Sequence, residues 1–321
     1  MLALATPLLT FALGAASPAA HNTDWLPASL DAGCDLTDVD FSDRQHGFAT
    51  CAFSAAMTTD DGGLTWHVFD TGLQQSLVFA RAAGTDELYA ARLGFYHSSD
   101  RGAHWEELGG LSGQQNTIFD VHFGDAGHVV AIHGGRLLYS DDGGAHWNVG
   151  WETVFGVDFD ELHFTSASIG YASGGTTNGQ GSLGSVLRTD DAGVHWTLLA
   201  FTHGEIVAAD FFDDDRGIVA TLAGELYSTA DGGTSWQLVG AVPDAAVLMD
   251  IAHRDDAHWY AVSLQGCLYE THDAGASWET GYCDPSSNAL VAITLRGGPA
   301  VAGGNDGVVL WENRILKDGF D

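Results

Sequence analysis

Positive charge is what this chain lacks most. Only 11 of its 321 residues are lysine or arginine, against 43 aspartates and glutamates, and Lys317 is its one lysine. The net charge of −32 would repel a phosphate backbone or an anionic lipid surface, so nucleic-acid binding is disfavoured. The same charge suits a soluble acidic protein with cationic partners, bound cations or salty surroundings.

Long apolar runs and catalytic signatures are also scarce. Residues 1–20 are uncharged and rich in Leu and Ala, which is typical of a secretory signal with a small-residue exit near Ala19 or Ala20. Pro7 and the short apolar length argue against a permanent membrane span, and no later segment is long enough to form one. The sequence has no H-E-x-x-H, G-x-S-x-G, EF-hand or N-x-S/T motif. We expect a periplasmic or secreted protein without an integral membrane span.

Four cysteines fit an oxidising compartment and allow three pairings. Cys34 and Cys51 are close in sequence, and Cys267 and Cys283 flank one predicted hairpin almost symmetrically. That symmetry would place the last two sulfurs across adjacent strands. We expect disulfides between Cys34 and Cys51 and between Cys267 and Cys283; the alternative is buried free thiols.

Internal repetition organises the rest of the chain. Six segments share the pattern Ser/Thr, any residue, Asp, any, Gly, any, any, Trp, and their tryptophans are 39, 42, 49, 40 and 42 residues apart. The aspartate and tryptophan of each segment are Asp61 and Trp66, Asp100 and Trp105, Asp142 and Trp147, Asp191 and Trp196, Asp231 and Trp236, and Asp273 and Trp278. Four positions that match six times predict one building block used repeatedly.

The residue types of this segment, which we call the box, suit a tight hairpin. A short carboxylate can accept backbone N–H groups of its own turn, and the glycine supplies a left-handed backbone angle that side chains resist. The tryptophan buries a large apolar surface against the sheet. We therefore interpret the boxes as structural rather than as ligand contacts.

Each box lies within a unit of four predicted strands. A short strand precedes it, as at 224–227, and a strand led by the tryptophan follows it, as at 236–239. Two further strands come before these, as at 120–123 and 128–132, with the alternation and β-branched content of strands. Four strands in about 42 residues is the size of a propeller blade.

The two ends of the chain complete the count of blades. After the sixth box, residues 290–295, 299–302 and 307–311 read as three strands without a box. Residues 25–27 resemble a strand that follows a box, so we expect them to complete the last blade and remove the exposed sheet edges. The predicted architecture is all-β: a seven-bladed β-propeller of four-stranded antiparallel blades at 21–316, after a signal peptide at 1–20 and before a short tail at 317–321.

Segments such as TDDGGLTW, SDDGGAHW and TADGGTSW resemble the boxes of the BNR/Asp-box superfamily over nearly the whole mature chain. Within it, the chain is similar to the photosystem II assembly and stability factor family and its non-photosynthetic bacterial relatives. The resemblance implies an exported, non-enzymatic, monomeric propeller that binds a protein or peptide without a cofactor and assists an envelope complex. Members of the family are thought to use an arginine-rich patch, which Arg92, Arg136 and Arg188, near one end of neighbouring blades, would echo.

Other families that share the box fit less well. Sialidases need three central arginines, but no predicted inner strand starts with arginine and the Arg-Ile-Pro segment of that family is absent. Xyloglucan-type endoglucanases place catalytic aspartates in a cleft between two propellers, which one propeller cannot form, and sortilin-type propellers have ten blades. A glycan-directed propeller, sialidase-like, another glycosidase or a lectin, is the alternative to protein binding.

Ligand contacts are expected on the rim opposite the boxes, where aromatic residues lie beside a few cations. Such residues can anchor a peptide or a sugar, although packing within the rim is the other interpretation. The candidates are Arg92, Phe95, Tyr96, His133, Arg136, Trp151, Phe155 and Phe201. Blade four has the longest repeat, and its extra residues at 173–184 predict a loop that could bind; the G-x-G-x-x-G match within it lacks a following helix.

A set of polar residues is expected along the central channel. One set occupies roughly equivalent positions of the inner strands: Asp40, His122, His163 and Asp210. A second set lies two residues earlier in its own repeats: Asp38, Asp120, Glu161 and Asp250. Residues two apart on a strand share a face, so both sets could face the channel. A water-filled channel with satisfied hydrogen bonds explains them, and a cation site is the alternative.

Overall fold

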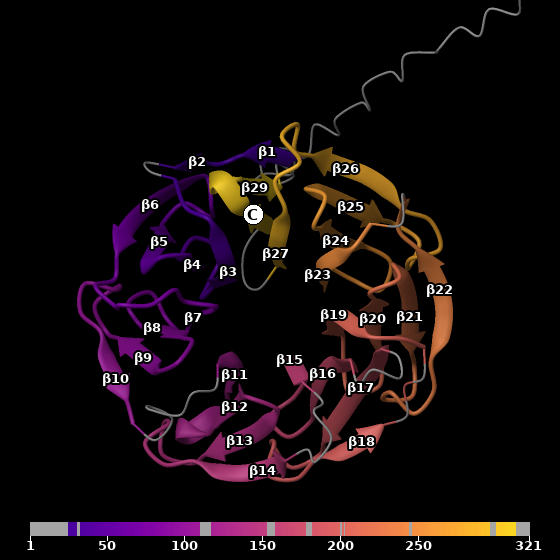
Figure 1. The fold of residues 1–321 in the computed structure, drawn as a ribbon, viewed down its shortest axis with the longest axis horizontal. Coiled ribbons are helices and arrows are strands. Elements are labelled where there is room, and N and C mark those ends of the chain that lie inside the picture. Colours follow the sequence, from indigo (N-terminus) through magenta and orange to yellow (C-terminus); the bar gives the residue numbers. More distant parts are fainter. Residues whose placement is uncertain are drawn as a thin grey trace, which may run out of the picture.

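Seven β-sheets surround a central channel in the computed structural model of the protein (Figure 1). The structure describes residues 25–312 apart from 31–32, 110–116, 153–157, 178–181, 200, 202, 244–245 and 296–299. The signal peptide and the C-terminal tail that the sequence predicts, and Phe155, lie outside the described residues. The predicted seven-bladed propeller is confirmed.

Each of the first four blades runs from the channel outward in chain order. Their strands are β3 (Leu36–Phe41), β4 (Gly47–Cys51), β5 (Ala55–Thr59) and β6 (Thr65–Asp70); β7 (Phe79–Ala82), β8 (Leu88–Ala91), β9 (Phe95–Ser98) and β10 (Glu106–Leu108); β11 (Ile118–Phe123), β12 (Val129–His133), β13 (Arg136–Ser140) and β14 (Asn148–Glu152); and β15 (Asp158–Phe164), β16 (Gly170–Thr177), β17 (Ser182–Thr189) and β18 (Thr197–Leu199).

The last three blades repeat this order. Short 3-10 helices lie in the turn between β11 and β12 of blade three (Asp125–Gly127) and in the turn between β28 and β29 of blade seven (Asn305–Gly307). Their strands are β19 (Ile206–Phe211), β20 (Gly217–Thr221), β21 (Glu225–Thr229) and β22 (Gln237–Ala241); β23 (Leu248–His253), β24 (Trp259–Ser263), β25 (Cys267–Thr271) and β26 (Glu279–Cys283); and β27 (Leu290–Thr294), β28 (Val301–Gly304) and β29 (Val309–Glu312) with β1 (Trp25–Pro27).

The N-terminal segment closes the ring, as predicted. β1 pairs antiparallel with β29, with Trp25 opposite Glu312. The chain then continues as β2 (Ser29–Leu30), which pairs parallel with β6 and adds a fifth strand to blade one. One segment thereby joins the seventh blade to the first, and two sheet edges are covered.

The hydrophobic core is divided among the boundaries between blades. Among the described residues, seven clusters of buried side chains occur, one at each boundary. The box tryptophans lie in the boundary with the preceding blade, where Trp66 of blade one packs against Phe41 and beside the last blade's Val301. Each blade therefore buries its apolar faces only against two neighbours, and stability depends on a closed ring.

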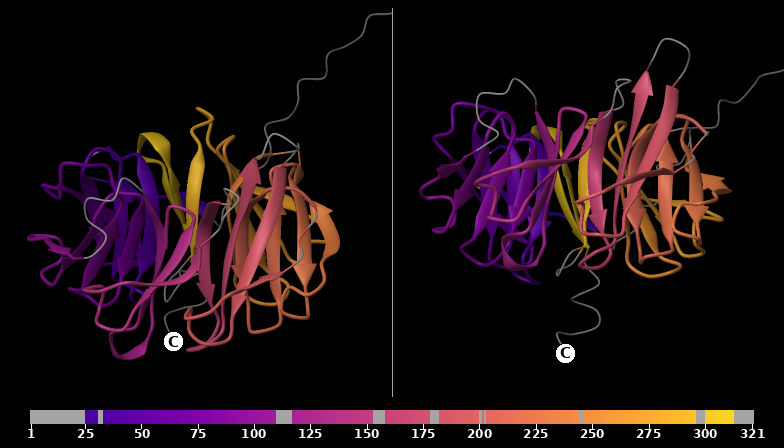
Figure 2. Two further views of the ribbon diagram at one scale, coloured as in Figure 1. Left: turned by 60° about the horizontal axis from the view of Figure 1, so that its bottom comes forward. Right: turned by 90° about the horizontal axis from the view of Figure 1, so that it is seen from below.

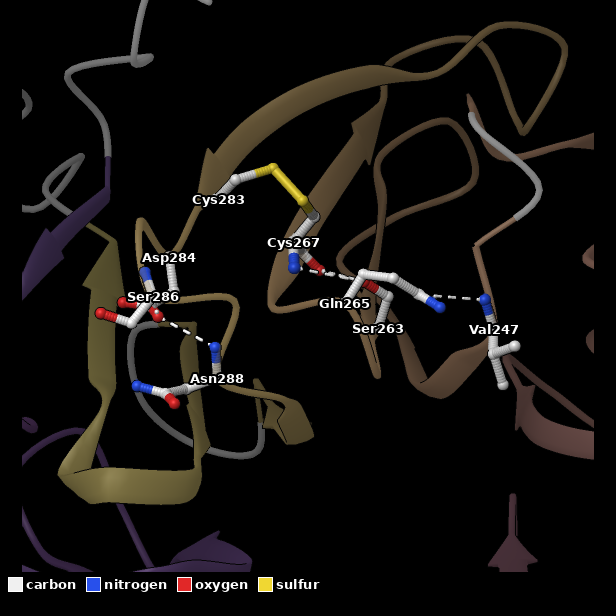
Figure 3. The surroundings of a disulfide bond; sticks show 8 residues. All are labelled: Val247, Ser263, Gln265, Cys267, Cys283, Asp284, Ser286 and Asn288. Atoms are coloured by element: carbon white, nitrogen blue, oxygen red, sulfur yellow. Dashed lines mark hydrogen bonds between the residues drawn. A yellow bond between two sulfur atoms is a disulfide. The ribbon is translucent and has the colours of Figure 1, made fainter.

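Two disulfides form with the expected pairing, Cys34–Cys51 and Cys267–Cys283. Figure 3 shows the second, which joins the directly opposed residues of β25 and β26. Beside it the Asp284 carboxylate accepts the N–H groups of Ser286 and Asn288, each at 3.0 Å, and shapes the turn that leads to blade seven. Disulfides are typical of proteins that fold outside a reducing cytoplasm.

The long repeat of blade four differs from its prediction as a loop. Its extra residues lengthen β16 and β17 to eight residues each, paired in register from Gly170 with Thr189 to Thr177 with Ser182. In Figure 2 this hairpin projects beyond the neighbouring strands. Strand pairing satisfies the backbone groups that a loop would expose to water.

No helix within the described part is long and apolar enough to span a membrane.

Candidate functional site

The box turns define one side of the ring, which we call the box rim. Each box also bonds to the turn between the first two strands of its blade, as when the Gly143 N–H donates to the Gly127 carbonyl at 2.8 Å and Gly232 to Asp215 at 2.8 Å. The other side carries the turns between the second and third strands and the connections between blades, and we call it the hairpin rim.

Box side chains bond within their own turns. In blade two the Ser98 hydroxyl accepts the Gly102 N–H at 2.8 Å, and Asp100 accepts the His104 N–H at 2.8 Å. Hydrogen bonds from His104 and His146 lower the pKa of Asp100 and of Asp142 to about 2. These polar groups are used inside the turn, which is the geometry that a structural role requires.

The central channel holds a cavity of about 510 Å³ whose wall is rich in carboxylates. It is surrounded by the first strand of each blade, as the view down the axis shows (Figure 1). The charged and ionisable residues that line it are Asp38, Asp40, Arg81, Asp120, Asp160, Glu161, His163, Asp210, Asp250 and His253.

Six of these carboxylates form what we call the inter-blade belt: each accepts an N–H group from the first strand of the next blade. The pairs and their N···O distances are Asp38 with Ala80 (2.8 Å), Asp40 with Ala82 (3.0 Å), Asp120 with Leu162 (2.8 Å), Glu161 with Ala209 (2.8 Å), Asp210 with His253 (2.7 Å) and Asp250 with Ile293 (2.8 Å). The first strand of each blade is an edge strand with no strand beside it on the channel side. The belt carboxylates supply the acceptors that its backbone N–H groups would otherwise lack.

Local irregularities in the inner strands place these carboxylates. The pairing of the first with the second strand shifts register just before Asp38, Glu161 and Asp250. Such a β-bulge re-aims a side chain, and here it lets the carboxylate reach the neighbouring blade. Asp38, Asp120 and Asp250 also accept the N–H of the residue that follows them, at 2.7 to 2.8 Å.

Arg81 is the principal cation of the channel. Its guanidinium lies 3.5 Å from Asp40 of blade one and 3.4 Å from Asp120 of blade three, and it donates to the Val121 carbonyl at 3.2 Å. His163 lies between Glu161 at 3.6 Å and Asp210 at 3.8 Å. Positive groups are thus outnumbered by carboxylates in the channel.

Burial in this crowded channel shifts the pKa values of the acids upward, whereas the pKa values of the box aspartates are lowered. It raises the pKa of Asp38 to about 7 and also raises the pKa of Asp120, Glu161 and Asp250. Burial opposes the charged form of His163, but the neighbouring Glu161 and Asp210 carboxylates raise its pKa above the usual value.

Asp40, His163 and Asp210 of the predicted channel set line the cavity. The ring of His122 stacks on Phe164, with centroids 4.0 Å apart. Within the described ranges, no three His, Cys, Asp or Glu side chains are placed to hold a metal ion.

The candidate ligand contacts lie at the hairpin rim in different environments. Phe95, His133 and Phe201 are buried and therefore are packing residues in this structure. Arg136 donates to Glu152 from Nε at 2.9 Å, and Tyr96 accepts a hydrogen bond from Gln75 at 2.6 Å. Arg92, Tyr96, Arg136 and Trp151 remain partly exposed.

The expected arginine patch does not form. Arg188 is next to the box of blade four, on the rim opposite Arg92 and Arg136, and donates to the Asp214 carbonyl of blade five at 2.7 Å. Arg81, Arg101, Arg216 and Arg254 likewise bind acidic groups of adjacent blades. Within the described ranges, these five arginines join adjacent blades.

Sequence reasoning missed a set of exposed apolar side chains on the hairpin rim. They occupy equivalent turns between the second and third strands of blades one, two, five and six: Phe53 (83% exposed), Leu93 (47%), Leu222 (46%) and Leu264 (50%). The signal was available, because each follows a predicted buried strand and stands where glycine or a polar residue is usual in a turn.

Known proteins resemble this chain along most of its length. The family model described as photosynthesis system II assembly factor YCF48 matches residues 97–280. The photosystem II assembly lipoprotein Ycf48 of Parasynechococcus marenigrum (strain WH8102) is 31% identical over 277 residues, which are 69% of this chain and 80% of that protein. Its namesake from Synechococcus sp. (strain CC9902) is 34% identical over 142 residues, 42% of this chain and 40% of that protein.

A solved structure has the same fold. A structure of YCF48 bound to a D1 peptide superposes with a TM-score of 0.73 at 19% identity, over 92% of this chain and 98% of that one. At this identity the likeness establishes the seven-bladed architecture. The lipoprotein names of the relatives and the two disulfides of this chain are both consistent with a place outside the cytoplasm.

Proposed function

The chain belongs to the Ycf48 family of photosystem II assembly factors, and from this premise we propose that it is an exported, non-enzymatic propeller that binds a protein partner during assembly of an envelope complex. The observation that carries the proposal is the match to an assembly lipoprotein, which is 31% identical and covers 69% of this chain and 80% of that protein. A relative of the same fold is known in complex with a peptide. We place the protein in the periplasm or the secreted fraction.

We propose the hairpin rim as the surface that the partner contacts. The box rim is occupied by its own hydrogen bonds, whereas the hairpin rim carries exposed apolar side chains and the partly exposed Arg92, Tyr96 and Trp151. Aromatic residues and arginine are enriched at the energetic centres of protein interfaces. Phe95, His133 and Phe201, which are buried, would hold these neighbours in place rather than touch the partner.

Depletion of the protein in its source cells tests the proposal. Envelope complexes are separated on native gels and their subunits quantified by mass spectrometry, with and without re-expression of the wild-type chain. We expect one complex to stall as a smaller intermediate and to be restored by re-expression. Photocrosslinking from Tyr96 or Trp151 should trap a subunit of the same complex, whereas crosslinking from the box-rim residue His104 should not.

Two results would contradict the proposed function. If depletion leaves every envelope complex at its normal size and amount, the protein is not an assembly factor. Binding of purified protein to a glycan array, with no crosslinked protein, would instead favour the glycan-directed alternative.

A further inference from the structure

The turn between β4 and β5 holds an aromatic ring in an unusual position. Phe53 and Ser54 both have left-handed backbone angles, with φ of 61° and 67°. The equivalent turn of blade three uses Gly134 and Gly135 at φ of 54° and 75°. A bulky residue in this conformation is rare, and glycine is the usual occupant. The Phe53 side chain is nevertheless 83% exposed, so burial within the blade does not explain why phenylalanine is there.

The Phe53 turn is held rigidly by its surroundings. Its N–H donates to the Ser76 hydroxyl at 3.1 Å, and the Ser54 hydroxyl donates to Asp70 at 3.1 Å. The Cys34–Cys51 disulfide joins the strand before the turn to the adjoining segment. An exposed ring on a fixed turn loses little conformational entropy on binding.

Phe53 borders a second cavity, of about 400 Å³, that has acidic walls. Asp35 and Asp306 line it together with the half-cystine Cys34. Asp35 accepts the Asp306 N–H at 2.7 Å, and this bond holds blade seven's turn against blade one. The cavity therefore combines one exposed aromatic face with two carboxylates from different blades.

We propose that this cavity, which we call the Phe53 pocket, binds a lysine or arginine side chain of the protein partner. An aromatic ring attracts a cation through its face, and carboxylates form charge-assisted hydrogen bonds with ammonium or guanidinium groups. This inference rests on the proposed function, because a protein partner is what would bring the basic side chain.

Charge complementarity selects the occupant. The chain carries 43 acidic and 11 basic residues, so an anionic ligand would be repelled before it reached two further carboxylates. A purely apolar side chain would desolvate Asp35 or Asp306 without compensation. A long basic side chain can lay its methylene groups on the ring and present its charge to the carboxylates.

Peptide binding measured by biolayer interferometry tests the Phe53 pocket. The probes are twelve-residue Gly/Ser peptides that differ only in one central residue: arginine, lysine or citrulline, the neutral analogue of arginine. We expect the arginine and lysine peptides to bind the full-length protein at least fivefold tighter than the citrulline peptide. Phe53→Gly and Asp306→Asn should each reduce that preference about threefold or more.

Matched variants separate the pocket from the general acidity of the protein. Asp86→Asn removes one exposed carboxylate from the box rim, and Leu93→Ala removes an apolar group from the next hairpin; both should keep the preference for arginine. Glycine and asparagine tolerate the left-handed angles of Phe53 and Asp306, so both pocket variants should melt within a few degrees of wild type.

Three results would contradict the proposal that the Phe53 pocket binds a basic side chain. These are equal binding of arginine and citrulline peptides, an equal loss from Asp86→Asn and Asp306→Asn, or full rescue of assembly in depleted cells by Phe53→Gly. The last result leaves the proposed function intact, because wild-type protein would still be required for assembly.

Discussion

Aspartates of the box rim and aspartates of the channel have opposite environments in one small ring. Asp100 and Asp142 are exposed, bond within their own turns and have lowered pKa values of about 2. Asp38 and Asp250 are partly buried in the channel, bond to the next blade and have raised pKa values. The box carboxylate organises one turn at little electrostatic cost, whereas the channel carboxylate joins two blades at the cost of desolvation.

Boxes also join blades, but through tryptophan rather than aspartate. The box tryptophan packs against the preceding blade, while the belt carboxylate bonds to the following one. Apolar contact and buried hydrogen bonds therefore act at the same boundaries by different physics. This distinction predicts which changes open the ring and which disturb only one turn.

The largest effect is expected for Trp66→Ala. Trp66 is 1% exposed, packs against Phe41 and donates its indole N–H to the Gly63 carbonyl at 3.0 Å. Truncation of a buried tryptophan costs about 3 to 5 kcal/mol. Urea denaturation should show this loss, and Trp105→Ala, at a partly exposed equivalent position, should cost less. Equal losses of unfolding free energy in Trp66→Ala and Trp105→Ala would contradict the interpretation that the core is best packed where the ring closes.

A smaller effect is expected for Asp38, and it depends on the replacement. Asp38→Ala leaves the Val39 and Ala80 N–H groups without their acceptor, which should cost about 1 to 3 kcal/mol. Asp38→Asn keeps one acceptor oxygen and removes the charge that burial disfavours, but its NH2 group faces the other N–H donor, so at pH 8 it should cost less than alanine. If alanine and asparagine are equally harmful in urea denaturation, the charge itself is what the boundary needs.

Sequence alone predicts the repeating part of this molecule and the closure of its ring. The six boxes and the strand at residues 25–27, which resembles one that follows a box, are local patterns, and the count of strands predicts that this strand completes the last blade, where it pairs with β29. The inter-blade belt was only partly foreseen, because a β-bulge decides where each carboxylate points. The stacking of His122 on Phe164 is a tertiary contact that the position of His122 in its strand does not reveal.

The Phe53 pocket lay beyond the reach of pattern reasoning. It is formed by residues from both ends of the chain, Asp35 and Asp306, which meet only when the ring closes. The left-handed angle of Phe53 breaks the usual preference for glycine in such turns, and departures of this kind cluster at functional sites. A sequence search for non-glycine residues at turn positions where blade three uses glycine would single out Phe53, but not the two carboxylates that the closed ring brings beside it.

The contrast between the two sets of carboxylates predicts an unusual dependence of stability on pH. For Asp38 the folded-state pKa is about 7, whereas its ordinary value is 3.8, so the folded protein binds the proton more tightly and loses stability as pH rises across that window. His163, whose pKa is also raised, adds a loss in the same direction as it deprotonates. The box aspartates act oppositely, losing their contribution as pH falls below 3.8 toward about 2.

Thermal melts between pH 3 and pH 9 would measure this dependence. We expect the highest melting temperature in mildly acidic buffer, with a decline toward pH 8 that is reduced in Asp38→Asn. A maximum at pH 8 in the wild type, or an unchanged decline in the variant, would show that the belt carboxylates are charged without penalty.

The smallest effect is expected where boxes differ only in the residue before the tryptophan. Blades two, three and four have His104, His146 and His195 there, whereas blades five and six have Ser235 and Ser277. Both residue types bond the second oxygen of the box aspartate, at 2.6 Å for His104 and for Ser235. His104→Ser should therefore change the unfolding free energy by less than about 0.5 kcal/mol, as expected for an exposed site. His104→Ala, which removes the bond, should cost more than serine does; the reverse order would mean that histidine acts at the box rim through something other than its aspartate.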